Sequence, residues 1–175
     1  DEIQSIFASA ELSWKNQLYL TVTGRNDWDS KLAFSKQKSF FYPSVGLSAL
    51  LSEMVKLPEV ISYAKIRGSY TVVASSFDRF LTNPGYEYNS QTHNWANPTV
   101  YPMDNMKPEK TKSWEIGLNL KFWGNRFNLD ATYYRSNTLN QTFKVDIPSS
   151  SVYKQAIVQA GNVQNQGIEL ALGFS

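Results

Sequence analysis

Residues 113–134 read SWEIGLNLKFWGNRFNLDATYY, and this stretch decides the fold of the chain. Before Gly124-Asn125, apolar side chains occupy the even positions from Trp114 to Phe122, and small or polar ones occupy the odd positions. After Gly124-Asn125 the odd positions are the apolar ones. Successive side chains of a strand point to opposite faces, so the pattern predicts two long strands with one apolar and one wet face. Gly-Asn between them is typical of a two-residue hairpin turn, because both residues tolerate positive φ.

The same alternation recurs along the chain and predicts about seven long strands in all. The other segments are residues 5–14, 18–27, 41–51, 64–73 and 166–174. The strand that begins at Phe127 is expected to continue through Leu139 to Val145, and one helical turn is expected before Pro58. The predicted loops are residues 27–39, 75–110 and 148–153, which are rich in polar and turn-forming residues. The fold class is therefore all-β.

The composition excludes several classes of protein. The chain has 17 basic and 15 acidic residues among 175, so no strong field toward nucleic acid is expected. It has no cysteine, which excludes disulfides and thiolate metal sites, and the single His93 argues against a histidine metal site or a catalytic triad. No apolar run is long enough for a transmembrane helix.

No catalytic constellation is found, so the protein is predicted not to be an enzyme. The carboxylates of the wet rows, Glu115 and Glu169 among them, have no paired base in the sequence, and ion pairing is the favoured role for them. No cofactor is predicted. A loop Ca²⁺ site is the one metal site left open, because hard oxygen ligands suit that ion. Its candidates, whose spacing matches no known loop pattern, are Asp27, Asp29, Asp104 and Glu109.

Two architectures fit alternating strands: a soluble β-sandwich with the apolar rows facing a core, or a membrane barrel with them facing lipid. The predicted strands hold about ten residues or more, the length that a tilted strand needs to cross a bilayer, whereas soluble strands are commonly about five or six residues long. The connections alternate in length, so Lys15-Asn16 and Gly124-Asn125 fall on one side of the sheet and the long loops on the other. Outer-membrane barrels have this asymmetry, which favours the membrane interpretation.

The distribution of charge supports the same interpretation. The apolar rows carry no charge before Arg135, which the predicted boundaries place at a strand end, and a wet lumen explains charges deep in the other rows. The charges predicted to face the lumen are Glu11, Arg25, Lys65, Arg67, Glu115, Lys121, Asp130 and Glu169. Aromatic residues predicted to form the belt at the membrane interface are Trp14, Tyr19, Trp114, Phe122, Trp123 and Phe127.

The odd number of strands predicts that the chain is one part of a larger barrel. Bacterial single-chain barrels have an even number of strands. An open sheet in lipid would leave two edges of unpaired backbone groups, each of which costs several kcal/mol. Residues 1–175 are therefore expected to be a portion of a barrel wall, with further strands supplied by chain outside them.

Five segments resemble SusC/RagA-type TonB-dependent outer-membrane transporters, in order along nearly the whole chain. They are FYPSVGL (41–47), AKIRGSY (64–70), KPEKTKSWEIGL (107–118), GNRF (124–127) followed by Asp130 and Tyr133-Tyr134, and GNVQNQGIEL (161–170). The chain departs from the family pattern at residues 107–110, where the usual Asn-Pro-Asp/Glu-Leu is shifted, and at residues 73–76, where Val-Ala-Ser-Ser replaces Gly-Asn. Both departures fall near loops, so they bear on the choice of ligand rather than on the fold.

The resemblance implies a plugged barrel of the 22-stranded class, of which this chain is the C-terminal part without the plug domain. It implies import of a glycan or an oligopeptide across the bacterial outer membrane, energised by the TonB complex, with a SusD-like surface lipoprotein as partner and with long loops outside the cell. A structural or adhesion barrel in the outer membrane, or a soluble β-sandwich binding module, stays open as the alternative.

Aromatic residues of the longest loop are the predicted ligand contacts. They are Tyr86, Tyr88, His93, Trp95 and Tyr101. Such rings stack on sugar faces or pack on a peptide, and a long loop in a compact domain commonly binds something. The alternative is that these rings pack the loop against itself or against the lid protein.

Overall fold

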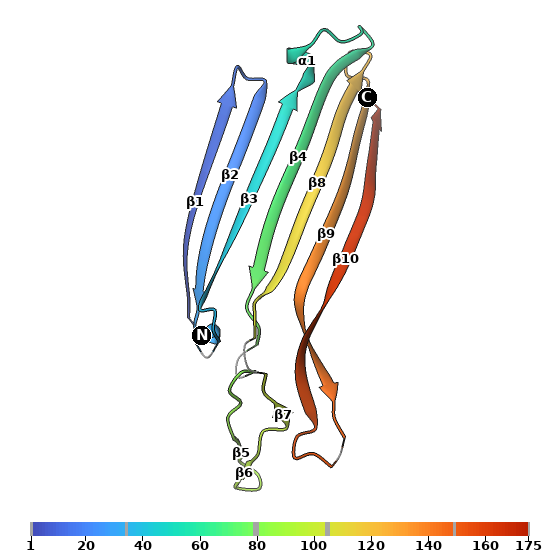
Figure 1. Cartoon of the computed structure of the whole chain (residues 1–175). Coiled ribbons are helices and arrows are strands. Elements are labelled where there is room, and N and C mark those ends of the chain that lie inside the picture. Colours follow the sequence, from blue (N-terminus) through green and yellow to red (C-terminus); the bar gives the residue numbers. More distant parts are fainter. Residues whose placement is uncertain (1, 34, 79–80, 104–105, 149, 175) are drawn as a thin grey trace.

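The computed structural model describes residues 2–33, 35–78, 81–103, 106–148 and 150–174. Seven long antiparallel strands form one sheet in the order β1-β2-β3-β4-β8-β9-β10 (Figure 1), which confirms the all-β class. The strands are β1 (Ile3–Trp14), β2 (Leu18–Asp29), β3 (Ser39–Leu50), β4 (Ile61–Ser75), β8 (Glu109–Phe122), β9 (Phe127–Asp146) and β10 (Gln155–Phe174). A short strand, β7 (Val100–Tyr101), joins the edge of β10 in parallel.

The two ends of the sheet differ in the length of their connections (Figure 1). One end carries the turns at 15–17 and 123–126 and the 51–60 connection, which contains the expected helical turn α1 (Leu51–Met54). The other end carries the loops 30–38, 76–108 and 147–154. The first of these begins with a 3₁₀ helix, η1 (Ser30–Leu32), and the second contains the hairpin of β5 (Glu87–Asn89) and β6 (Asn94–Ala96). The predicted segregation of short and long connections is therefore present.

Most strands extend further toward the long loops than the alternation predicted. β8 begins at Glu109 rather than near Trp114, and β10 begins at Gln155 rather than at Gln166. The residues added to β10 carry Gln, Asn and Val on both faces, so they gave no periodic signal. The expectation that β9 continues past Tyr134 is confirmed, since the strand runs to Asp146.

The turn between β8 and β9 is wider than predicted. Phe122 pairs with Phe127, so four residues, 123–126, separate the strands instead of Gly124-Asn125 alone. Three of the four have positive φ: Trp123 at 49°, Gly124 at 64° and Asn125 at 70°. The sequence signal identified where the chain reverses, but the left-handed conformation of Trp123, which few non-glycine residues adopt, was not foreseeable from its type.

The register aligns the apolar rows into a continuous band across the sheet. Along β8 the band runs from Phe122 to Trp114, opposite Phe127 to Arg135 on β9. These eight residue steps, at about 3.3 Å each, span roughly 26 Å, close to the apolar belt of an outer-membrane barrel, which is about 25 Å tall. The pairing predicted from the side-chain period is thus confirmed by the register.

Aromatic pairs lie at both limits of this band. At the turn end, the rings of Phe122 and Phe127 are 6.1 Å apart, and at the loop end the rings of Trp114 and Tyr133 are 5.2 Å apart. Arg135 pairs opposite Trp114 and donates to Gln164 Oε1 at 2.7 Å. The prediction that Arg135 ends its strand is wrong, because β9 continues to Asp146; Arg135 instead marks the limit of the apolar band.

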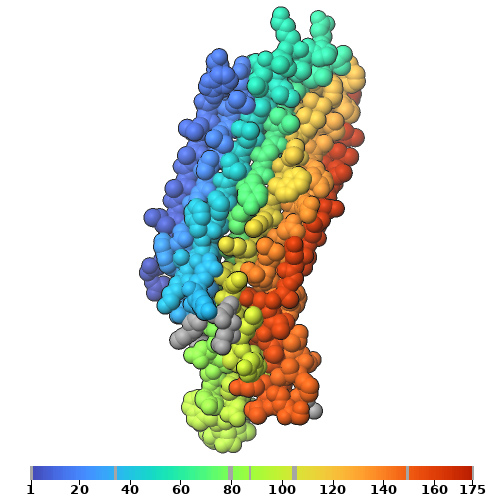
Figure 2. Space-filling view, in the orientation of Figure 1, coloured from blue at the N-terminus to red at the C-terminus, as the bar shows by residue number. Residues whose placement is uncertain are grey.

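The apolar band is not covered by a second layer within the described residues. Ile116 is 52% exposed and Leu170 69% exposed, and the face in Figure 2 consists of strands side by side with no element over them. No helix in the described part of the chain is long and apolar enough to cross a membrane. A sandwich needs a second sheet against this face, so the described structure does not support that alternative.

A small core lies instead at the long-loop end of the sheet. Its buried members come from η1, the start of β3, the end of β4, the approach to β8 and the start of β10; they are Leu32, Phe40, Ala74, Phe77, Met106 and Ile157. The side chains of Leu32 and Met106 are at most 1% exposed. The long loops are therefore tied to the strand ends by buried apolar contacts.

The β9–β10 ribbon changes its twist where it leaves the main sheet (Figure 1). Asn140 has φ of 61° and Gly161 has φ of 92°, and the continuous register places these two residues opposite each other. Beyond them, Gln159 donates from Nε2 to Lys107 O at 2.6 Å and accepts from Lys107 N at 2.8 Å. The Gln159 side-chain amide thus bonds both the N–H and the C=O of Lys107, as the backbone of a neighbouring strand would, and fixes the loop before β8.

A matched pair of arginine substitutions on β2 tests which face meets lipid. Leu20 lies in the apolar band and the next residue, Thr21, lies on the opposite face. We expect Leu20→Arg to destabilise the folded full-length protein by up to about 2–4 kcal/mol, the cost of a charge in mid-bilayer. Thr21→Arg, beside Glu11, should change stability little. Urea unfolding in lipid vesicles measures both, and equal effects would contradict the assignment of faces.

Candidate functional site: the charged face and the outer loops

Arg67 of β4 forms an ion pair that spans three strands on the face opposite the apolar band. Its guanidinium passes over β8 and binds both carboxylate oxygens of Asp130 on β9, at 2.9 and 3.1 Å. The same group donates to Thr132 Oγ1 at 2.6 Å, and Asn119 Nδ2 donates to Asp130 at 2.9 Å. A bidentate contact of this kind restricts the geometry of both partners more than a single hydrogen bond does.

Gly117 makes this contact possible. It lies on β8 between Arg67 and Thr132 in the register. A Cβ atom built on Gly117 would lie 2.5 Å from Arg67 Nε and 2.7 Å from Arg67 Cζ, closer than atoms approach without displacement. The glycine is therefore required by the close passage of the arginine side chain rather than by a turn.

A second charged cluster lies nearer the long loops. Arg25 donates from Nε to Asp27 Oδ1 at 2.7 Å and from Nη2 to Ser5 Oγ at 3.0 Å. The hydroxyl of Tyr42 donates to the other oxygen of Asp27, and the Arg25 guanidinium lies 5.8 Å from the centre of the Tyr42 ring. Asp27 is buried. The carboxylate therefore neutralises Arg25 and anchors the tyrosine.

The register places all eight predicted charges on the same face of the sheet. The pairs in Glu11–Thr21–Gly46–Ser69–Glu115 and in Arg67–Gly117–Thr132–Glu169 run straight across neighbouring strands. Lys121 lies over the ring of Tyr63 at 5.4 Å. Of the predicted charges, the structure brings Arg67 and Asp130 into direct contact. Sequence analysis missed Gly117, Asn119, Thr132 and Tyr42, whose only signal was their position in the wet rows.

The predicted belt residues divide between the two faces. Trp14, Trp114, Phe122 and Phe127 lie in the apolar rows, and the Trp123 ring in the turn packs 5.9 Å from Phe122. Tyr19 is the exception: it pairs opposite Ser13 and Ser48 on the charged face, and its hydroxyl donates to Asn16 O at 3.2 Å. The prediction for Tyr19 is therefore wrong, because its odd position points it away from the apolar band.

Three of the five predicted loop aromatics meet on the β5–β6 hairpin. Tyr88 pairs opposite Trp95, with ring centres 5.1 Å apart, and its hydroxyl lies 3.1 Å from His93 Nδ1. Trp95 is 69% exposed. Tyr101 lies elsewhere, on β7, where its ring meets Tyr153 edge-on at 5.2 Å. Tyr86 is exposed just before β5. The predicted group is thus a cluster of three with two outlying members.

The Ca²⁺ candidates do not converge in the part of the chain that the structure describes, where no group of three or more acidic or histidine side chains is arranged for a metal. Asp27 is engaged by Arg25 and Tyr42. Asp29 accepts from Lys31 N and from Ser76, and Glu109 begins β8. Asp104 lies outside the described residues, so this prediction stays untested.

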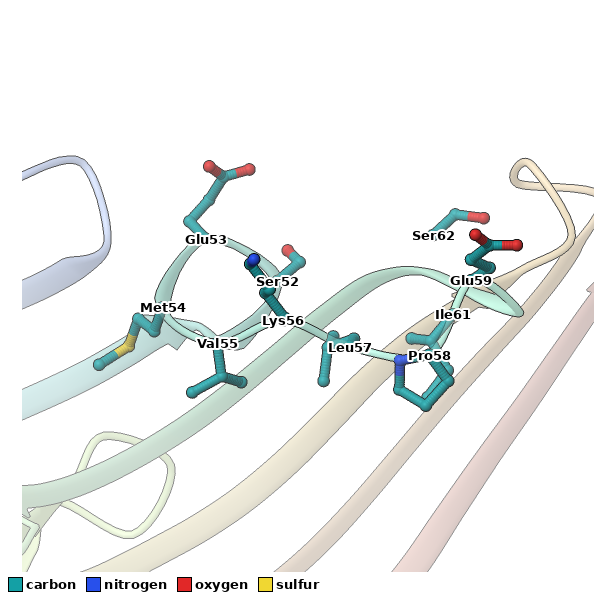
Figure 3. A pocket seen from close by; sticks show the side chains of 10 residues that line it. All are labelled: Ser52, Glu53, Met54, Val55, Lys56, Leu57, Pro58, Glu59, Ile61 and Ser62. Atoms are coloured by element: carbon teal, nitrogen blue, oxygen red, sulfur yellow. The ribbon is translucent and has the colours of Figure 1, made fainter.

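The clearest hollow at the turn end is lined by α1 and the chain that follows it, residues 52–59 with Ile61 and Ser62 (Figure 3). Its volume is about 350 Å³. In Figure 3 the Glu53 and Glu59 carboxylates point outward rather than toward each other. Since the loop aromatics lie at the opposite end of the sheet, this hollow is separate from them.

The chain matches one protein family over its whole length. The profile described as TonB dependent receptor-like, beta-barrel, matches residues 1–175, and the chain belongs to this family. It is 26% identical to TonB-dependent receptor P26 of Formosa agariphila, over 98% of this chain and 18% of the relative. It is 24% identical to TonB-dependent receptor SusC of Bacteroides thetaiotaomicron, over 96% of this chain and 18% of the relative.

Solved structures agree with this assignment. The structure of the RagAB peptide importer in the open-open state matches with a TM-score of 0.81 at 20% identity, over 97% of this chain and 19% of that one. The siderophore receptor PirA from Pseudomonas aeruginosa matches with a TM-score of 0.66 at 15% identity, over 96% of this chain and 30% of that one. The predicted SusC/RagA-type resemblance is confirmed, and the chain spans about a fifth of the length of the SusC and RagAB relatives.

A double-mutant cycle tests the role of Gly117. We expect Arg67→Ala and Asp130→Ala in the full-length protein to be coupled by about 0.2–1 kcal/mol of unfolding free energy, the range for partly exposed ion pairs. The coupling should fall to near zero in a Gly117→Ala background, because the new methyl displaces the guanidinium. Gly46→Ala is the control, since its added Cβ meets nothing within 4 Å. A coupling that survives Gly117→Ala would contradict the role given to the glycine.

Proposed function

We propose that the complete protein imports a nutrient, a glycan or an oligopeptide, across the bacterial outer membrane in a TonB-dependent manner. The observation that carries this proposal is the uncovered apolar band, about as tall as a bilayer core, on a sheet whose other face carries every predicted charge. Membership of the TonB-dependent receptor family supports it. In this proposal the apolar face meets lipid and the charged face lines the lumen.

In this proposal residues 1–175 form the C-terminal part of the barrel wall, and chain outside them supplies the plug and the remaining strands. In the described residues, β1 has a strand neighbour on one side only, and β10 is paired on its outer side only through Gln155 and Ala156. Lipid offers these open edges no hydrogen-bond partner, so the edges need further strands. The short turns then face the periplasm and the long loops face outward.

A surface lipoprotein of the SusD type is the proposed partner at the long-loop end. The SusC relative and the RagAB structure support this assignment. The exposed Tyr88–His93–Trp95 cluster is the proposed contact with ligand or with that partner, because its rings lie against one another at tilted angles and are open to solvent. A purely structural or adhesion barrel is the alternative, and it would need neither TonB nor a substrate.

Growth experiments on the native gene test import directly. A strain without the complete gene should lose growth on one class of glycan or peptide as sole nutrient, and the complete gene should restore it. Removing TonB function in the complemented strain should abolish growth again, because uptake through a plugged barrel requires that energy source. Unchanged growth on every nutrient would favour the structural alternative, and uptake retained without TonB would contradict the proposed TonB dependence.

Substitution of the hairpin tryptophan tests the loop cluster. We expect Trp95→Ala in the full-length protein to weaken ligand or lipoprotein binding by about tenfold, the effect of roughly 1.4 kcal/mol at an aromatic contact. Trp123→Ala, at the turn end of the sheet, is the control and should leave binding unchanged. Pull-down of the lipoprotein and uptake of labelled substrate distinguish the two roles, and wild-type values in both assays would rule the cluster out.

A further inference from the structure

A groove on the charged face lies where two central strands separate. β3 and β4 pair from Leu50–Lys65 to Ser44–Thr71, and the pairing stops there. Beyond this point, toward the long loops, β3 pairs only with β2, and β4 only with β8. Pro43 is the first residue of β3 past the separation, and it has no N–H to donate to a ladder.

The groove has a volume of about 430 Å³, within the roughly 300–1,000 Å³ of small-molecule sites. Two rows of side chains line it. One row carries four hydroxyls, and the register aligns them straight across β1 to β4: Ser9, Thr23, Ser44 and Thr71. The next row toward the loops carries Phe7, Arg25 and Tyr42, with Val73 on the far side of the gap.

Phe7 is the unexplained member of this groove. It sits in a wet row, opposite Arg25, and its side chain is 76% exposed. An apolar ring on the face that carries the charges gains nothing from lipid and is not buried by the described residues. Tyr42, two strands away across Arg25, is fixed, because its ring stacks on Phe40 at 5.8 Å and its hydroxyl donates to Asp27. The groove therefore has one exposed and one fixed aromatic wall.

The one charged side chain in the lining is neutralised by a neighbouring carboxylate, so the groove offers a ligand no unpaired charge. Arg25 is the one charged residue among those that line it, and its guanidinium is bound by Asp27 at 2.7 Å and by Ser5 at 3.0 Å. Its hydroxyls each both donate and accept hydrogen bonds, and Thr23 and Ser44 are already within 2.6 Å of each other. Such a lining suits a neutral ligand with many hydroxyl groups and discriminates little in favour of a charged one.

We propose that this groove is a binding subsite for an uncharged sugar, with the ring stacked on Phe7 and its hydroxyls bonded to the row from Ser9 to Thr71. The apolar C–H face of a sugar ring packs on an aromatic ring, and a few placed polar groups then fix its orientation. The inference rests on the proposed import function and narrows it to a neutral glycan. It also adds a site on the sheet that is distinct from the β5–β6 hairpin.

Equilibrium binding to the full-length protein, purified with its lipoprotein, tests the proposal. The probes are neutral hexasaccharides of glucose, xylose and mannose, with hexapeptides of mixed sequence as the competing class. We expect one neutral hexasaccharide to bind, and Phe7→Ala and Thr71→Val each to weaken it by about tenfold, while Arg25→Lys, which keeps the charge, weakens it less. Phe41→Ala is the control, because Phe41 is also an exposed phenylalanine, at 57%, but lies on the apolar face.

The subsite is overturned if no neutral hexasaccharide binds, if binding is unchanged in Phe7→Ala, or if peptides bind in a Phe7-dependent manner. If Phe7→Ala instead lowers the thermal stability of the protein without touching binding, the groove holds another segment of the protein itself, which also overturns the proposal. TonB-dependent growth of the Phe7→Ala strain separates the two hypotheses. If the Phe7→Ala strain still grows in a TonB-dependent manner and the binding results overturn the subsite, the import hypothesis is retained. If growth of the wild type does not depend on TonB, both hypotheses are rejected.

Discussion

The structure depends on an unbroken ladder of backbone hydrogen bonds between long strands. Lipid offers backbone N–H and C=O groups no partner, so a sheet whose apolar face meets lipid must satisfy every one of them between strands. In the described residues every neighbouring pair of strands from β1 to β10 is joined by such a ladder, and the register shifts between Ile61 and Tyr63, near the turn end. The separation of β3 from β4 at Pro43 begins near the loop end, where that constraint relaxes.

The charged face is stabilised by side-chain contacts between strands. Gly117 leaves room for a long side chain to cross a neighbouring strand, as Arg67 does to reach Asp130. A cross-strand contact of this kind ties β4 to β9 across the intervening strand β8. Within the described residues this face is not covered by another element, and its two ion pairs neutralise Arg25 and Arg67.

Sequence reasoning succeeded where burial and exposure alternate strictly. The rows from Trp114 to Phe122 and from Phe127 to Tyr133 were assigned to the correct face, because a side-chain period of two places every second residue on the same face of the sheet. It failed where both faces are wet, as in residues 155–165 of β10, and where backbone conformation departs from residue preference, as at Trp123. Tyr19 was misassigned because aromatic type was weighed above its position in the row.

The sequence by itself determined the strands, the two faces, the segregation of short and long connections and the family, because side-chain period and turn residues are local properties. Only the tertiary structure decided which residues meet across strands: that Arg67 passes Gly117 to bind Asp130, that the Tyr88 ring contacts Trp95, and that Phe7 lines a groove. These contacts depend on the register between segments far apart in the chain. No local pattern encodes that register, since it is set by the pairing of whole strands.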